Sequence, residues 1–178
     1  MAKASRERPA PRAMAGTGQE PASITVRRAR PSDLSHVVRL RLALLHEHGE
    51  HPVYSRLRKD AEKRAHEMFA SQLVSPGEVI FLAERDGEVV GILRCVESLA
   101  SPLLEPPRYG YVSSVYVTPE ARRHGVLRAL VASAEAWCRD RGLTEIRLHS
   151  VVGDPVSGTA WDRTGFEPVE VVRLKRLT

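Results

Sequence analysis

The sequence has few cysteines and no long apolar run, and both features narrow the class of protein. Cys95 and Cys138 are the only cysteines in 178 residues, and each lies in a segment expected to be a strand or a helix. Two such thiols do not suggest a disulfide framework or a cysteine metal site, so we expect a protein of the reducing cytoplasm. No apolar run approaches the roughly 20 residues of a membrane span, and the first residues lack the apolar core of a secretory signal.

Internal repeats are also lacking, and the length fits one folded domain. A chain of 178 residues is long enough to bury a sizeable core. The formal charge of +5 at pH 7 suits a polyanionic partner. Nucleic acid is one such partner among others, so charge alone does not select the ligand.

Residues 1–22 differ from the rest of the chain in composition. They are rich in alanine, proline, glycine and arginine and almost free of large apolar side chains, which predicts a disordered basic tail. A nucleic-acid-binding arm is disfavoured, because this segment has no aromatic residue on which a base could stack. We therefore expect one folded domain at residues 23–178.

The folded part is expected to begin with a short strand and two helices. The strand covers Ile24 to Val26, and the motif RPSDL then opens a helix with Ser32 or Asp33 as its N-cap. A second helix, stopped by the pair Pro76-Gly77, is predicted from apolar residues that would form its inner face: Val53, Leu57, Ala61, Ala65, Met68 and Phe69.

Turn residues divide the second half of the chain into strands. Asp86-Gly87 stands between two β-rich runs and is a strong hairpin signal, which predicts strands near 79–85 and 88–97. The stretch 144–152 (TEIRLHSVV) is expected to be a strand parallel to the one before the preceding helix, since a helical crossover links them. The stretch 166–177 (FEPVEVVRLKRL) is predicted to be the last strand.

The stretch from Tyr109 to Leu130 is typical of a strand, a tight turn and a helix that begins on a glycine. A helix start exposes backbone N–H groups that no earlier carbonyl satisfies, and it carries the positive end of the helix dipole. Both suit a phosphate group. Gly125 has no Cβ and allows close approach, while Arg122, Arg123 and His124 add positive charge.

This spacing resembles the acetyl-CoA-binding motif of the GNAT N-acetyltransferase superfamily: Arg or Gln, two residues, Gly, one residue, then Gly or Ala. Arg122 and Gly125 match the first and fourth positions, whereas Leu127 stands where the family usually has Gly or Ala. The motifs VYVTPEAR and DGEVVG and the pair Gly165-Phe166 are also similar to family elements. The resemblance covers most of the chain from Ile24 onward.

The resemblance implies an α/β fold with a mixed, mostly antiparallel sheet of six to seven strands. Helices flank this sheet, and its parallel central strands four and five are splayed apart. The implied reaction transfers acetyl from acetyl-CoA to a primary amine of a small molecule or protein, by direct attack in a ternary complex. A homodimer is possible in this family, and neither a membrane nor a metal ion is implied.

The resemblance also assigns residues to the acetyl-CoA site. Strand four and the helix start would contribute Val115, Tyr116, Val117, Arg122, Arg123, His124, Gly125, Val126, Leu127 and Arg128. Asp154, Ser157 and Trp161 fall at or near positions where the family has Asn, Ala and Tyr. That phenol often serves as a general acid, which an indole N–H does not. Trp161 is therefore either a core aromatic residue or a cover over the CoA.

The general base is not fixed by the sequence. Tyr111 on strand four, Ser113 beside it and Glu97 on the preceding strand are the candidates. Leu127 shares a helical stripe with Leu130, so we expect its side chain to face the sheet rather than the phosphate.

The end of the first helix holds His46, His48 and His51 together with Glu47 and Glu50. These are metal-ligand residue types, but residues two apart point to different sides of a helix, so an exposed polar helix end is favoured. In GNAT enzymes this region usually borders the acceptor pocket, which implies that Glu47, His48 and Glu50 could meet a cationic amine.

Two other functions stay open at this point. The departures at Leu127 and Trp161 allow a CoA-binding domain without activity. The basic surface allows a nucleic-acid-binding module, which salt-dependent binding of DNA or RNA without CoA would indicate.

Overall fold

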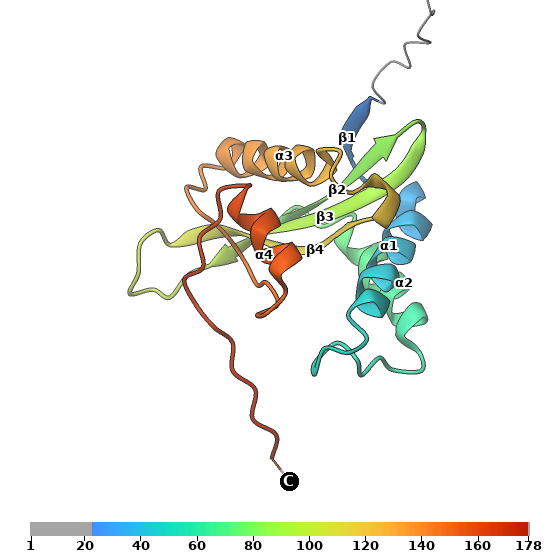
Figure 1. The fold of residues 1–178 in the computed structure, drawn as a ribbon. Helices are drawn as coiled ribbons and strands as arrows, with labels where there is room; N and C mark the ends of the chain where they lie inside the picture. The colour runs from blue at the N-terminus through green and yellow to red at the C-terminus, as the bar shows by residue number, and fades with distance from the viewer. Residues whose placement is uncertain (1–22, 178) are drawn as a thin grey trace, which may run out of the picture.

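The computed structural model of the chain describes residues 23–177, so the predicted tail at 1–22 lies outside the described residues. One sheet with helices on both faces makes up the described part (Figure 1). The elements are β1 (Ile24–Arg28), α1 (Leu34–Glu47), α2 (Ala61–Gln72), β2 (Glu78–Arg85), β3 (Glu88–Leu99), β4 (Arg108–Val117), α3 (Val126–Asp140), β5 (Ile146–Leu148) and α4 (Pro155–Asp162).

The sheet is mixed and mostly antiparallel, as predicted. Its order is β1-β2-β3-β4-β5, and only the β4–β5 pair is parallel. The Asp86-Gly87 hairpin is confirmed, since β2 and β3 pair on either side of it. The described residues form five strands rather than the expected six to seven.

Strands β4 and β5 separate soon after they meet. Gly110 to Val112 pair with Ile146 to Leu148, and β4 then continues to Val117 without a β5 partner. The strand predicted at 144–152 is therefore shorter. The prediction of a last strand at 166–177 is wrong, because these residues form no strand in the structure. The three-residue β5 offers too short an edge to hold a further ladder, and the valines of this segment stay exposed.

Two apolar clusters hold the layers together. On one face, α3 packs its buried residues against β2, β3 and β4, and Trp161 and Phe166 from the α4 region join that cluster. On the other face, α1 and α2 cover a second cluster that includes Phe69, Leu82 and Ile92. Figure 1 shows α3 on one side of the sheet and α1 and α2 on the other. No helix within residues 23–177 is long and apolar enough to cross a membrane.

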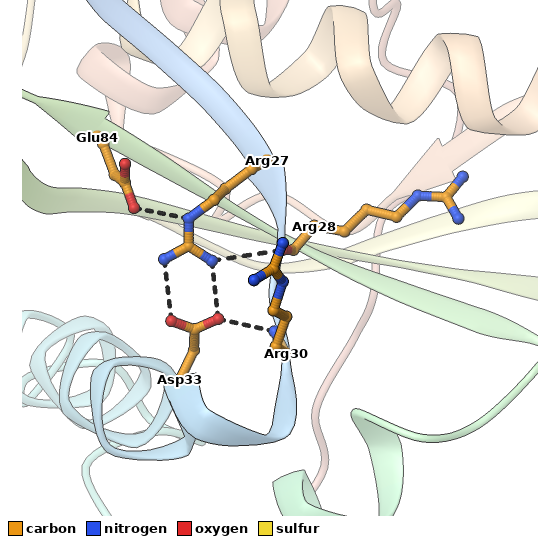
Figure 2. Close-up of polar contacts among 5 residues, drawn as sticks. All are labelled: Arg27, Arg28, Arg30, Asp33 and Glu84. Carbon is orange, nitrogen blue, oxygen red and sulfur yellow. Dashed lines mark hydrogen bonds and ion pairs between the residues drawn. The ribbon is translucent and has the colours of Figure 1, made fainter.

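The first helix begins at a buried carboxylate. Asp33 directly precedes α1, as predicted for an N-cap, but its side chain does not bond to the helix backbone. Arg27 instead donates to both of its oxygens at 2.7 and 2.9 Å, and the Arg30 N–H donates at 2.7 Å (Figure 2). The same guanidinium also reaches Glu84 at 2.7 Å. This network ties β1 and β2 to the start of α1.

The second helix is shorter than the sequence predicts. It begins at Ala61, so Val53 and Leu57 lie before it and are 53% and 38% exposed. Ala65 and Phe69 are buried as expected, whereas Met68 is exposed. The apolar spacing misleads here because residues before the helix start have no helical face to share.

A glycine in β4 lets α3 lie close to the sheet. A Cβ placed on Gly110 would come within 2.5 Å of the Cys138 Sγ, far inside van der Waals contact. Cys95 from β3 completes this contact, with its Sγ 3.7 Å from that of Cys138. Both are free, buried thiols. Gly110 therefore sets how closely α3 approaches β4.

Candidate functional site

The turn between β4 and α3 has the backbone shape that the motif predicts. Gly125 has a φ of 89° and is the N-cap of α3. This left-handed conformation is open to glycine and strained for most other residues. Arg123 precedes it with a φ of 64°. A Cβ placed on Gly125 would meet no atom within 4 Å, so the space in front of the turn is open.

The start of α3 presents backbone donors that the protein itself leaves unpaired. The first ladder bond runs from the Ala129 N–H to the Gly125 carbonyl at 3.0 Å. Within residues 23–177, the N–H groups of Val126, Leu127 and Arg128 have no hydrogen-bond partner, and no side chain caps the helix. Such a start attracts an anion through its donors and its dipole. The exposed side chains of Arg123, His124 and Arg128 surround it with positive charge.

Arg122, the first residue of the motif, has a different position from its neighbours. Its Nε donates to the Val117 carbonyl at 2.9 Å, and its Nη2 lies 2.5 Å from the Glu47 carboxylate. The guanidinium also lies over the Tyr116 ring, 5.6 Å from its centroid. The Glu47 bond raises the pKa of Arg122. Arg122 thus ties the end of α1 to the turn, and Glu47 is occupied by this pair.

The first two residues of α3 turn their side chains toward the core. Val126 is buried, and Leu127 packs against the cluster beneath α3. The predicted orientation of Leu127 is therefore confirmed.

A β-bulge bends β4 where it parts from β5. Ile92 pairs with Tyr116 and Arg94 pairs with Ser113, so one residue of β3 stands opposite two of β4. Ser114 takes a φ of 53° at this point. From Ser113 to Val117, β4 has no strand partner on its β5 side. The predicted contact segment Val115–Val117 therefore has no strand neighbour on that side, and its Val117 carbonyl already accepts from Arg122.

Tyr111 meets a residue that the sequence analysis did not single out. Its hydroxyl lies 3.1 Å from the Nδ1 of His149, and the two rings pack edge to face with centroids 5.5 Å apart. His149 directly follows β5, so the pair spans β4 and β5 where their pairing ends. Burial raises the pKa of Tyr111. A histidine immediately after an apolar strand was the only signal in the sequence.

The other two base candidates are engaged elsewhere. Glu97 lies 2.5 Å from Arg108 and 3.6 Å from Arg141. It shares the α3 face of the sheet with Cys95, two residues earlier, whereas Tyr111 points to the opposite face. Ser113 accepts a hydrogen bond from Arg94 at 3.2 Å. The structure therefore does not bring Glu97 together with Tyr111.

The three predicted residues of the α4 region serve that helix. The Asp154 carboxylate caps α4 by accepting from the N–H groups of Val156 and Ser157 at 3.0 and 3.3 Å. Trp161 packs edge to face on Phe166, with centroids 5.5 Å apart, and joins the core cluster. This packing favours the core role of Trp161 over the role of a cover.

The histidines after α1 form a local turn. The Nδ1 of His51 accepts from the N–H groups of Val53 and Tyr54 at 3.2 and 3.4 Å, and its ring stacks on Tyr54. In the described part of the chain, no three histidine, cysteine or acidic side chains lie close enough to hold a metal ion.

Known proteins share both the sequence pattern and this fold. Residues 42–166 match the model of the acetyltransferase (GNAT) family. An aminoglycoside N(6')-acetyltransferase type 1 of Stenotrophomonas maltophilia is 31% identical over 155 residues, which are 86% of this chain and 92% of that protein. The chain therefore belongs to the GNAT acetyltransferase family. This membership confirms the predicted class, an acyltransferase enzyme.

Solved structures agree on the fold. A predicted acetyltransferase from Clostridium acetobutylicum, solved with acetyl-CoA, superposes with a TM-score of 0.71 at 20% identity over 86% of this chain and 96% of that one. AAC(6')-Iy in complex with the bisubstrate analog CoA-S-monomethyl-acetylneamine gives 0.69 at 21% identity, over 88% and 99%. Acetyl-CoA is thus a co-substrate found with this fold.

Proposed function

We propose that the protein transfers an acetyl group from acetyl-CoA to a primary amine within a ternary complex. The observation that carries the proposal is the open start of α3, with Gly125 in the left-handed region and unpaired N–H groups behind it. A pyrophosphate fits these features because it is anionic, needs several donors and requires close approach to the backbone. Acetyl-CoA supplies the activated acyl group as a thioester.

The chain's own residues divide the remaining tasks. The N–H groups of α3 and the side chains of Arg123, His124 and Arg128 would hold the phosphates. The free edge of β4 at Val115–Val117 would hold the pantetheine arm through backbone hydrogen bonds and donate to the oxyanion. Leu127 does not obstruct this, since its side chain packs on the core.

Tyr111 and His149 are our candidates for proton transfer. The attacking amine must lose a proton, and a hydroxyl bonded to a neutral imidazole can accept one and pass its own proton to the ring. The 3.1 Å hydrogen bond between them supports this relay. The protonated pair could return the proton to the departing thiolate, a role that Trp161 cannot fill.

Turnover and binding together test the proposal. Acetyl-CoA should raise the melting temperature, because a ligand that binds only the folded state stabilises it by about 2.7 kcal/mol at 100 times its Kd. Release of CoA from acetyl-CoA should then depend on an added amine. The relatives named as aminoglycoside acetyltransferases make an aminoglycoside one amine of the panel.

The other outcomes separate the remaining functions. Binding of acetyl-CoA without turnover of any amine would indicate an inactive CoA-binding domain. No thermal shift at millimolar acetyl-CoA, with calorimetry also flat, would remove both CoA-based functions. Salt-dependent binding of DNA or RNA would then favour the nucleic-acid module.

A further inference from the structure

A hollow on the α1–α2 side of the sheet is lined by positive charge. Its volume is about 260 Å³, and α1, α2 and the residues that precede α2 enclose it. Four arginines line it, with leucine, alanine and methionine side chains between them, and its lining includes no carboxylate. The arginines are Arg41, Arg56, Arg58 and Arg64. A cation would be repelled by this lining, whereas an anion would be attracted.

Two of these arginines share one carboxylate as their partner. Arg58 and Arg64 both bond to the Asp60 carboxylate, at 3.1 and 2.7 Å. Within residues 23–177, Arg41 and Arg56 have neither a hydrogen bond nor an ion pair. Arg41 is the more unusual of the two, because burial lowers its pKa; Tyr54 acts to raise this pKa and the charge of Arg94 acts to lower it. A partly buried guanidinium without a counter-charge is costly.

Arg94, the cation near Arg41, has its own counter-charge. It forms a 2.5 Å ion pair with Glu78 and donates to the Ser113 hydroxyl at 3.2 Å. Ser113 stands two residues after Tyr111 on the same face of β4. The charge of Arg94 also acts on Tyr111. Arg41 itself stands on α1, the helix that covers the face of the sheet to which Tyr111 points.

We propose that Arg41 binds an anionic group of the acceptor, so the acceptor is an amine that carries a carboxylate. This inference rests on the proposed function and names its substrate class. A guanidinium and a carboxylate form a charge-assisted, often bidentate pair, which would supply the counter-charge that Arg41 lacks.

The expected acceptor differs from that named for the relatives. An aminoglycoside carries several positive charges, and it would face a surface of arginines here. Two nearby carboxylates are engaged, Glu47 with Arg122 and Asp60 with Arg58 and Arg64, whereas the exposed Glu50 after α1 has no ion pair within residues 23–177. Charge therefore discriminates between the two acceptor classes.

Matched pairs of amines test this charge preference directly. We would measure kcat/KM with acetyl-CoA for leucine against leucinamide, for 6-aminohexanoate against its amide, and for neamine as the polycation. The carboxylate member of at least one pair should be preferred by about tenfold or more, as expected for a charged hydrogen bond. A preference for neamine or for the amides would overturn the inference.

Variants at the hollow give a second, independent measurement. Arg41→Met should raise KM for the carboxylate substrate about tenfold and leave the amide unchanged, while Arg41→Lys should restore part of the preference. Arg139→Met is the matched control, because Arg139 is exposed, paired with Glu135 and outside the lining of the hollow. Equal losses for acid and amide in Arg41→Met, in a variant that melts like wild type, would contradict the inference.

Binding separates failure of this inference from failure of the proposed function. Melting temperatures would be recorded with 6-aminohexanoate alone and with CoA present, for wild type and Arg41→Met. A shift that depends on Arg41 supports the anion site even if no amine turns over. Its absence, in a protein that still responds to acetyl-CoA, overturns the inference and leaves the proposed function standing.

Discussion

The starts of α1 and α3 present the same electrostatic problem and receive opposite solutions. At α1 the chain places its own buried carboxylate, Asp33, and surrounds it with Arg27 and the Arg30 N–H. At α3 it places Gly125 and no side-chain acceptor. At the first start, the carboxylate is paired with donors of the protein itself. The second leaves donors and positive charge exposed, which is useful only if an anion arrives from outside.

The difference indicates that the start of α1 contributes to stability, whereas the start of α3 is left available for a ligand. Asp33 is 7% exposed and has a pKa lowered to about 2, chiefly by its hydrogen bond to Arg27. Its contacts therefore stabilise the fold. The α3 start contributes no such pair, so we expect changes there to affect ligand affinity more than folding.

The largest change in stability is expected at the start of α1, where Asp33 is paired with Arg27; we call this the closed start. Arg27→Met leaves Asp33 buried without a counter-charge and frees Glu84, so the free energy of unfolding should fall by about 3–5 kcal/mol. Urea melts measure the loss, and calorimetry should find CoA affinity unchanged in the folded variant. A loss below about 1 kcal/mol would show that the closed start does not support the fold.

Changes at the start of α3, which we call the open start, should alter the affinity for CoA. In Gly125→Val, the branched side chain occupies the space of the phosphate and disfavours the left-handed backbone. We expect Kd for CoA to rise at least about a hundredfold, which is ~2.7 kcal/mol. Gly142→Val is the control, since Gly142 has a φ of 70° and open space but follows the far end of α3. Equal CoA affinity in Gly125→Val and wild type would show that the α3 start does not hold the phosphate.

Acid should affect the closed start alone. A carboxylate whose folded pKa is about 2 and whose ordinary value is 3.8 contributes stability above about pH 4 and loses it as pH falls toward 2. The difference in unfolding free energy between wild type and Asp33→Asn should therefore shrink by about 2 kcal/mol across that range. Chemical melts at pH 6, 4, 3 and 2 measure it. A constant difference would show that the Asp33 charge is not involved.

The smallest effect is expected at Leu127, where the motif departs from its family. Its half-buried side chain packs on the core, so Leu127→Ala should lower the unfolding free energy by about 1–2 kcal/mol. CoA affinity should change by less than about tenfold, or ~1.4 kcal/mol. A hundredfold gain in affinity without loss of stability would mean that this side chain faces the ligand.

The sequence predicted the features that depend on neighbouring residues. The hairpin at Asp86-Gly87, the strand before the turn and the helix that begins after Gly125 all follow from local turn chemistry and apolar spacing. The family resemblance added the splayed parallel pair. These elements position the α3 start, so this half of the candidate site was predictable.

The features that could not be predicted from the sequence depend on partners distant in the chain. Arg122 meets Glu47 across 75 positions, and Tyr111 meets His149 across 38. No local pattern encodes either pairing. The last strand failed for a similar reason: residues 166–177 have a strand-like composition, but a strand forms only where a neighbour supplies a ladder, and β5 is three residues long.

Gly110 constrains the position of the α3 start, although it does not contact that start. A methyl group there would collide with Cys138 near the end of α3, so the helix would have to shift or tilt as a rigid rod. Its opposite end carries the Gly125 turn. Selection for a correctly placed start of α3, the proposed anion site, would therefore act on position 110 through the position of the helix. Natural variation at this position should be narrow even though glycine has no side chain to contribute to the chemistry.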